Sequence, residues 1–281
     1  MTATDAPTLD TPDAQAGLVP ARRRFTPPSS ALGLLGLVGF AVLLEVLPRT
    51  GIVSRDYFPP LSAMVTAMVD EVQTAGFWDA MTETLLGWGI GLGISLVAGI
   101  ALGLLLGSVE VLRRYTASTI EFLRPVPSVA LIPLAVLLFG FQLQSTLLLV
   151  IYASFWQVLI QVLYGVQDVD PVARETARSY QLGPVARLRY LIWPTALPYV
   201  MTGVRLAAAV ALILAVTAGL VGVGRGLGAE IAVAQSSGAV PLVYGLVITT
   251  GLLGVVINLL ARALERRTLS WHSSMRADIG G

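Results

Sequence analysis

Charged side chains inside apolar stretches are the residues of this chain whose types and spacing could do chemistry. Glu121 and Arg124 lie three residues apart in one such stretch, and Arg205 lies eight residues into another. A charge deep in a bilayer costs roughly 2.5–3.5 kcal/mol on insertion scales, so it usually faces a cavity or an opposite charge. These three residues are therefore candidates for lining a polar path through a membrane.

The same positions have structural alternatives. Glu121 and Arg124 can pair along one helix face, and the long side chain of Arg124 can extend to the inner headgroups. Arg205 can also reach headgroups, or it can pair with a neighbouring helix. Both interpretations remain open for each arginine.

Several kinds of chemistry are excluded by residue type. The chain has 281 residues and no cysteine, its single histidine is His272 near the C-terminus, and all 18 of its Lys and Arg residues are arginine. Thiol catalysis, a histidine base and a histidine-bound metal within the apolar stretches are therefore excluded. A phosphate-binding P-loop requires a lysine. We expect no cofactor on this chain, and any ATP with its Mg²⁺ must bind another subunit.

The composition indicates a protein that crosses a membrane several times. Hydrophobic residues make up 55% of the chain, charged residues 12%, and the mean hydropathy is +0.78. A soluble domain carries about twice that share of charge. The formal net charge of +1 gives no reason to expect a nucleic acid partner.

Apolar stretches of about 20 residues predict six membrane helices. The predicted spans are about 31–48, 83–107, 116–140, 144–164, 198–222 and 240–262, and prolines at 125, 127 and 133 interrupt the third. Together they form a predicted transmembrane domain over 31–267. Residues 1–30 are expected to be a disordered cytoplasmic tail, and 268–281 a second cytoplasmic tail.

Arginine placement predicts the orientation. With the N-terminus inside, thirteen of the 18 arginines lie in inner segments and three in outer segments. Positive residues accumulate on the cytoplasmic side of membrane proteins. Both termini are therefore predicted to be cytoplasmic.

Glycines mark two further features. Gly at four-residue steps within 83–107 predicts close helix packing, with a sliding surface during gating as the alternative. Alternate glycines from Gly222 to Gly228 predict a flexible outer loop. On the same outer side, an amphipathic helix is predicted from Leu61.

The inner segment 165–197 carries the most specific pattern. Asp170 before Pro171 is a strong helix start. Gly183 and Pro184 are expected to end that helix with a left-handed cap and to start a second one. The result is a compact pair of short helices between two spans, which is either an ordered solvated loop or a rigid knob that another protein grips.

The sequence Glu175-Thr176-Ala177, followed by Trp193-Pro194 and Leu197-Pro198, resembles the EAA motif of permease subunits of ABC importers. In that family the loop docks into a cleft of an ATPase subunit. The resemblance makes Glu175, Ala177, Arg178, Gly183 and Pro194 the candidate docking residues. Two positions depart from the motif: Gln181 replaces a glycine, and Trp193 replaces a leucine.

The resemblance extends over about residues 31–271. The sequence Leu123-Arg124-Pro125-Val126-Pro127 and the later Gly203-Val204-Arg205 and Gly226-Leu227-Gly228 are similar to permeases of the nitrate, sulfonate and taurine type. Gly219 stands where that branch often has a glutamate.

The resemblance implies an all-α membrane protein of six transmembrane helices with a cytoplasmic coupling loop, like type I ABC importer permeases. It implies a transport subunit in a bacterial inner membrane that performs no covalent chemistry. The implied partners are an ABC ATPase dimer, a periplasmic or lipid-anchored solute-binding protein, and a second permease chain. The implied solute is a small anion such as a sulfonate, taurine or nitrate.

Two other classes of membrane protein are alternatives. An ion-coupled secondary transporter needs a carboxylate at membrane depth, and Glu45 and Glu121 are the only candidates. An intramembrane enzyme is disfavoured by the missing cysteine, lysine and membrane histidine.

Overall fold

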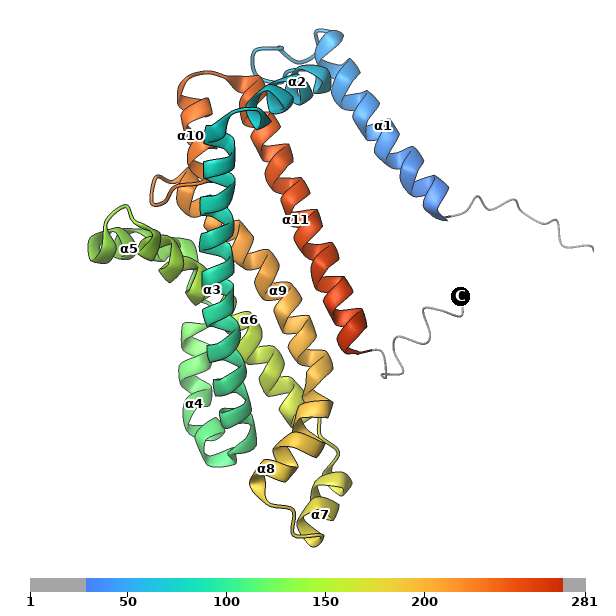
Figure 1. Ribbon diagram of the computed structural model, residues 1–281, viewed down its shortest axis with the longest axis vertical. Helices are drawn as coiled ribbons and strands as arrows, with labels where there is room; N and C mark the ends of the chain where they lie inside the picture. The colour runs from blue at the N-terminus through green and yellow to red at the C-terminus, as the bar shows by residue number, and fades with distance from the viewer. Residues whose placement is uncertain (1–28, 270–281) are drawn as a thin grey trace, which may run out of the picture. The chain divides into compact units, whose positions relative to one another are not determined.

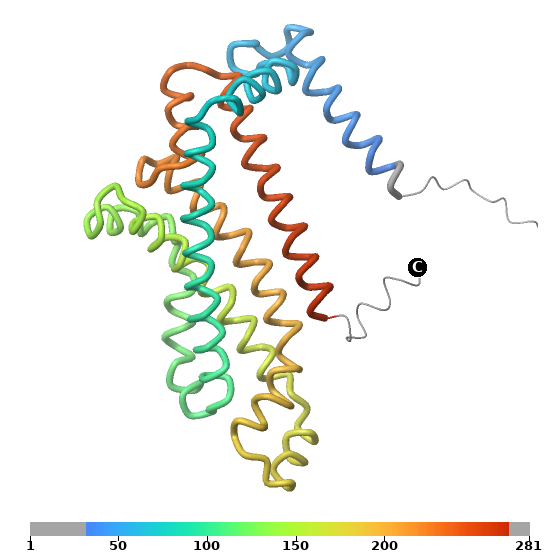
Figure 2. Tube along the Cα trace, viewed as in Figure 1, coloured from blue at the N-terminus to red at the C-terminus, as the bar shows by residue number. Residues whose placement is uncertain are grey.

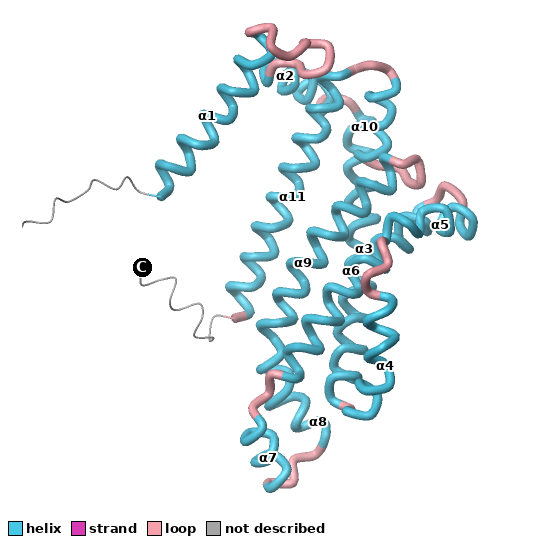
Figure 3. The backbone as a smooth tube through the Cα atoms, turned by 180° about the vertical axis from the view of Figure 1, so that it is seen from behind, coloured by secondary structure: helices cyan, strands magenta, loops and turns pink. Residues whose placement is uncertain are grey.

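The computed structural model describes residues 29–269, and all regular structure in that range is helical (Figures 1 and 3), which confirms the predicted all-α class. The chain divides into two compact units, Met1–Leu43 and Leu44–Gly281. In the first unit, the described residues belong to helix α1 (Ser29–Arg49) and expose apolar side chains such as Leu34 and Leu37. An all-apolar helix surface suits lipid. The tails predicted at 1–30 and 268–281 lie almost wholly outside the described residues.

The second unit contains the end of α1 and all the remaining helices. They are α2 (Leu61–Val72), α3 (Ala75–Ser108), α4 (Glu110–Leu123), η1 (Ser128–Leu131), α5 (Ile132–Phe139), α6 (Leu143–Gln167), α7 (Pro171–Ser179), α8 (Pro184–Arg187), η2 (Leu188–Ile192), α9 (Trp193–Leu220), α10 (Leu227–Ser236) and α11 (Val240–Thr268). Figure 2 shows that α7 and α8 lie at one end of this unit and α2 at the opposite end.

Helix α6 is the centre of the packing, with α3 against one side and α9 against another. The buried core between them consists of Val, Leu and Ala side chains, including Leu149, Val158 and Ala211. Polar side chains link these helices at depth. The indole of Trp88 donates to the carbonyl of Ala208 at 2.9 Å, and such bonds satisfy polar groups that have no water.

The glycines of α3 lie along its contact with α6. A Cβ added to Gly99, Gly103 or Gly107 would lie 2.7–2.8 Å from the Cβ of a valine on α6. Only glycine permits this separation, because real side-chain atoms do not approach so closely. A Cβ added to Gly89 or Gly93 would have no atom within 4 Å outside the neighbouring backbone of its own helix. The predicted close packing is confirmed for the glycine row that faces α6, whereas Gly89 and Gly93 make no such contact within the described chain.

Within residues 29–269, five single helices are long and apolar enough to cross a membrane. They are Leu32–Arg49, Ala75–Ser108, Leu143–Gln167, Pro184–Leu220 and Val240–Thr268. The stretch 116–140, predicted as one interrupted span, is a pair of helical segments bent by 81°, and it makes a sixth span only if the pair crosses together. Helix α3, which contains the predicted span 83–107, begins earlier, at Ala75.

The bend has a local cause. Pro125 and Pro127 cannot donate backbone hydrogen bonds, and their rings exclude the preceding turn of a helix. At 1.5 Å per residue, the 14 residues of α4 extend about 21 Å, which is less than the ~30 Å of a bilayer core. The segment from η1 to α5 therefore leaves the direction of α4 before α4 could span a bilayer by itself (Figure 1).

Helix α2 begins at Leu61, as predicted, after Pro59 and Pro60. Its buried Met64 lies against α11, where a Cβ on Gly245 would meet the Met64 carbonyl at 3.0 Å. The Glu45 carboxylate accepts a hydrogen bond from the Ser62 backbone N–H at 2.8 Å. Glu45, one of the two carboxylates considered for ion coupling, is thus engaged in holding the start of α2.

Candidate functional site

The segment between α6 and α9, here called the α7–α8 loop (168–192), is built from local signals. The Asp170 carboxylate accepts a hydrogen bond from the Val172 N–H at 2.7 Å, and Pro171 occupies the first turn of α7. This cap satisfies a backbone donor that the helix itself cannot. The predicted helix start is therefore confirmed.

The turn after α7 is set by Gln181, which has φ +53°. The Leu182 N–H donates to the Ala177 carbonyl at 3.0 Å and the Gln181 N–H to the Arg178 carbonyl at 2.9 Å, the bond pair of a Schellman cap. Gly183 has φ −64°, so the expectation of a left-handed cap there was wrong. Gln181 stands where the EAA motif has glycine, and that glycine would adopt this backbone without a Cβ penalty.

Two side-chain hydrogen bonds fasten the α7–α8 loop to its spans. The Tyr199 hydroxyl on α9 donates to the Asp168 carboxylate at 2.9 Å, and the Arg174 guanidinium donates to the Val166 carbonyl at 3.0 Å. Ala177 is buried on the inner face of α7. The loop is thus joined to both α6 and α9, so a displacement of α7 is passed to two spans.

Glu175 and Arg178 lie exposed on α7 and form no ion pair with each other or with any other described residue. Their three-residue spacing on one helix would allow a pair, and the structure does not form it. Both charges remain available to an external partner.

Pro194 lies in the first turn of α9, and the helix runs without a break from Pro184 to Leu220. The turn just before it, η2, is a π-helix. A π turn widens the backbone, which accommodates a proline ring and its missing N–H. The chain around Trp193 and Pro194 is thus a continuous helix that connects the α7–α8 loop directly to α9.

The predicted path residues lie at two places. Glu121 and Arg124 are exposed and line a cavity of about 670 Å³ together with Arg113, Arg114 and Tyr164. Glu121 and Arg124 form no ion pair in the described part of the chain. Arg205 pairs across helices with Glu265 of α11 at 3.4 Å, in agreement with the helix-pairing alternative.

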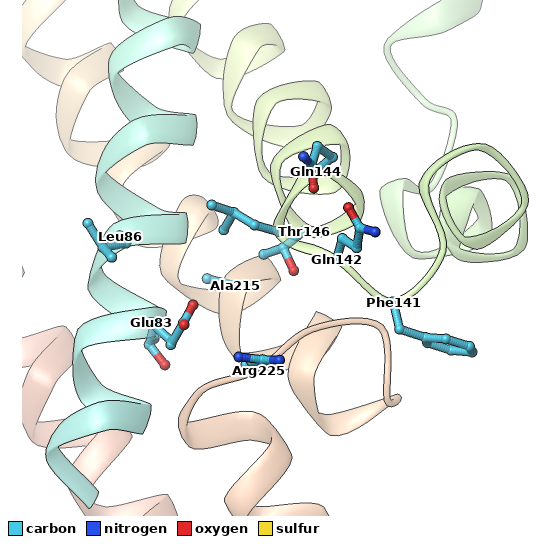
Figure 4. Close-up of a pocket in the computed structure, with 10 residues that line it drawn as sticks. Glu83, Leu86, Phe141, Gln142, Gln144, Thr146, Ala215 and Arg225 are labelled. Atoms are coloured by element: carbon cyan, nitrogen blue, oxygen red, sulfur yellow. The ribbon is translucent and has the colours of Figure 1, made fainter. Parts of the chain in front are cut away.

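Another cavity, of about 360 Å³, lies where α3, the start of α6 and the end of α9 meet (Figure 4). Its polar lining comes from Glu83 and Thr84 on α3, from Gln142, Gln144 and Thr146 at the start of α6, and from Arg225. From the sequence, Gln142 and Gln144 are only weak candidates, as polar residues in a short outer loop between two predicted spans, and the other four are not candidates. Two features of the sequence could have indicated this site: Glu83 is an acidic residue at the start of a predicted span, and Arg225 is an arginine within a run of glycines.

The segment 221–226, here called the α9–α10 loop, holds Arg225 in that cavity. Gly226 has φ +108°, and a Cβ on it would overlap the Thr84 hydroxyl. The Leu227 N–H donates to that same hydroxyl oxygen at 2.9 Å. A Cβ on Gly224 would overlap the Thr146 hydroxyl. The expectation of a flexible loop at Gly222–Gly228 was therefore wrong for its second half, which is pinned against α3 and α6.

No group of three His, Cys, Asp or Glu side chains within residues 29–269 is arranged to hold a metal ion.

Comparisons with known proteins agree with these features. A family model described as "binding-protein-dependent transport system inner membrane component" matches residues 95–270. The taurine transport system permease protein TauC of Escherichia coli is 29% identical over 257 residues, which cover 89% of this chain and 94% of that protein. The nitrate import permease protein NrtB of Leptolyngbya laminosa is 26% identical over 193 residues, 69% of each chain.

Among solved structures, an inward-facing MetNI methionine ABC transporter contains a chain that superimposes with a TM-score of 0.59 at 18% identity. The match covers 68% of this chain and 95% of that one. At this identity the likeness shows a shared fold, which is that of an ABC importer permease.

Proposed function

Because the chain belongs to the family of binding-protein-dependent transport system inner membrane components, and is thus an ABC transporter permease, we propose that it carries a small anion through the membrane by alternating access. A separate ATPase drives the change of state. The chain itself is a transport subunit and catalyses no covalent step.

The observation that carries this proposal is the construction of the α7–α8 loop. Helix α7 is capped by the Asp170 side chain, the charges of Glu175 and Arg178 are exposed and unpaired within the described residues, and hydrogen bonds join the loop to α6 and α9. A partner that grips α7 therefore moves two spans at once. A solvated connecting loop would need none of these connections.

The partner that grips this loop is proposed to be the ATPase. The chain has no lysine with which to bind nucleotide phosphates. ATP and Mg²⁺ then belong to two ATPase subunits, each docked on the α7–α8 loop of one permease chain. The candidate contacts are Glu175, Ala177, Arg178, Gly183 and Pro194.

The orientation is proposed from charge. Arginines gather in the α7–α8 loop, which has four, on α4, which has Arg113 and Arg114, and at the end of α11, with Arg266 and Arg267 in its last turn. Positive residues favour the cytoplasmic side. The cavity containing Arg225 then opens toward the outer side, where a solute-binding protein delivers its ligand to a permease pair.

The solute class is proposed from the two relatives, which are named for taurine and nitrate transport. Both compounds carry an anionic group. The unpaired guanidinium of Arg225, in a cavity near the outer ends of three spans, supports an anion. Arg124 supports a further anion-attracting point near the inner end of the path.

The docking role is tested with Glu175→Arg. Reversal of an exposed charge leaves the fold intact, so the variant should insert normally but lose the ATPase subunit during affinity purification in mild detergent. Glu110→Arg is the matched control, because Glu110 is also an exposed glutamate on a helix and its ion pair with Arg114 is solvent-exposed. Exposed pairs contribute only about 0–1 kcal/mol.

Normal recovery of the ATPase with Glu175→Arg would contradict the docking role. A chain that purifies alone and moves solute into liposomes without ATP would contradict the whole proposal and favour the ion-coupled transporter.

A further inference from the structure

The cavity that contains Arg225, here called the outer cavity, is lined by charges of both signs that form no ion pair with the described residues. Glu83 and Arg225 both line it, and neither forms an ion pair or a side-chain hydrogen bond with any residue in the described range. The side-chain amides of Gln142 and Gln144 are also free of hydrogen bonds within that range. Figure 4 shows these groups approaching one opening from three segments of the chain.

Thr146 adds an open hydroxyl to the same cavity. The residue is only 6% exposed, and its hydroxyl has no hydrogen-bond partner among the described residues. The hydroxyls of Thr84, Ser95 and Thr249 differ, since each donates to a carbonyl one turn earlier in its own helix. The fully buried side-chain atoms without a partner in the described range belong to Trp156 and Arg187, so the Thr146 oxygen is accessible from the cavity and can bond a solute or water.

The backbone on both sides of Arg225 is fixed by contacts with α3 and α6. The flanking glycines, Gly224 and Gly226, approach Thr146 and Thr84 so closely that a side chain at either would overlap a hydroxyl. The hydrogen bond from the Leu227 N–H to Thr84 fixes the same segment. A cation is thereby held over the first turn of α6 by backbone contacts with two spans.

These groups select a class of solute by their charges. A simple anion would pair with Arg225 and leave the Glu83 carboxylate unpaired beside a like charge. A simple cation would leave Arg225 unpaired, and a neutral solute would leave both. Specificity arises from such unpaired charges as much as from attractive contacts.

We infer that this cavity is a solute subsite of the permease for a small zwitterion. The anionic end lies toward Arg225 with the Gln142 amide and the Thr146 hydroxyl, and the ammonium end lies toward Glu83. A volume of about 360 Å³ is near the lower end of the range of ligand sites, in keeping with a small solute. The inference rests on the proposed function, which requires only an anion, and adds the requirement for a positive group.

The test measures binding to the permease without its solute-binding protein. The permease is co-purified with its ATPase, placed in lipid nanodiscs and incubated with radiolabelled taurine as the probe zwitterion. Ethanesulfonate, which lacks only the amine of taurine, is the competing simple anion. β-Alanine and propionate form a second pair with a carboxylate in place of the sulfonate.

For the wild-type complex, each zwitterion is expected to compete at least about tenfold better than its matched anion, the effect of one lost charge-assisted hydrogen bond. Glu83→Gln should abolish this preference while ethanesulfonate still binds. Arg225→Gln should weaken every probe by about tenfold or more. Glu230→Gln on α10 is the matched control, since Glu230 lies outside the cavity lining and should keep the wild-type preference.

Equal competition by taurine and ethanesulfonate in the wild type would overturn the inference, as would unchanged binding in Arg225→Gln or no binding of any probe at millimolar concentration. Recovery of the ATPase and ATP-dependent uptake are measured on the same preparations. If both are normal while binding fails these tests, the zwitterion subsite is wrong and the permease assignment stands. If the wild type lacks both, the proposed function itself fails.

Discussion

The two loops at the ends of α9 are ordered by different kinds of contact. The α7–α8 loop is held by contacts that are mostly within six residues of one another, such as the Asp170 cap and the turn at Gln181. The α9–α10 loop is held by residues far away in the sequence, with Leu227 bonded to Thr84, 143 positions earlier. The first exposes its charges at Glu175 and Arg178, and the second places Arg225 in a cavity.

This difference indicates how each loop responds to change. A loop whose shape is set by its own residues can move as a rigid piece together with the spans to which it is bonded, which suits a part that transmits force. A loop fastened to neighbouring spans changes shape whenever those spans shift, which suits a part whose affinity for solute should vary between states. Substitutions should therefore damage the whole molecule in the second loop and remain local in the first.

The largest contrast is expected between two Gly→Ala substitutions. A Cβ on Gly228 would overlap the Val216 carbonyl and force α10 away from α9, whereas nothing lies within 4 Å of Gly183, whose φ is −64°. Gly228→Ala should cost about 3 kcal/mol of unfolding free energy, and Gly183→Ala less than about 0.5 kcal/mol. Thermal unfolding midpoints in detergent measure both, and equal midpoints would refute the contrast.

A smaller contrast is expected for two threonines. Thr84→Val keeps the shape but leaves the buried Leu227 N–H without an acceptor, at a cost of about 1–3 kcal/mol. Thr176→Val removes an exposed hydroxyl that bonds only within α7, so its effect should stay within about 0.5 kcal/mol. Thermal unfolding with hydrogen exchange at the α9–α10 loop gives the readout. Equal losses in the two variants would show that the outer loop does not depend on Thr84.

The smallest effect is a gain. Gln181→Gly should stabilise the α7–α8 loop by about 0.5–1 kcal/mol, because a left-handed residue with a Cβ costs roughly 1–2 kcal/mol and glycine returns part of that as chain entropy. Gln181→Ala keeps the Cβ and is the control. Exchange protection of the Leu182 amide reports the change. The same protection in both variants would mean that the backbone at 181 is not strained.

Much of the fold could be predicted from sequence because its signals are local. Apolar length located five of the helices that can span a membrane, and Asp170 with Pro171 located the start of α7. The prolines at 125 and 127 indicated an interruption, but its geometry, a bend of 81°, is known only from the structure. The candidate docking residues were likewise accessible from motif spacing, and their assignment remains a prediction.

The cavity could not be predicted, since its parts are separated by up to 142 positions. Glu83 looked like the edge of a span and Arg225 like a charge in a flexible loop. Residue types alone indicated that this chain crosses a membrane and has no lysine with which to bind nucleotide phosphates. Only the tertiary structure showed that Glu83, Thr146 and Arg225 line one cavity. Their proximity depends on how the glycine and valine surfaces of neighbouring helices pack, and no spacing along the chain encodes that packing.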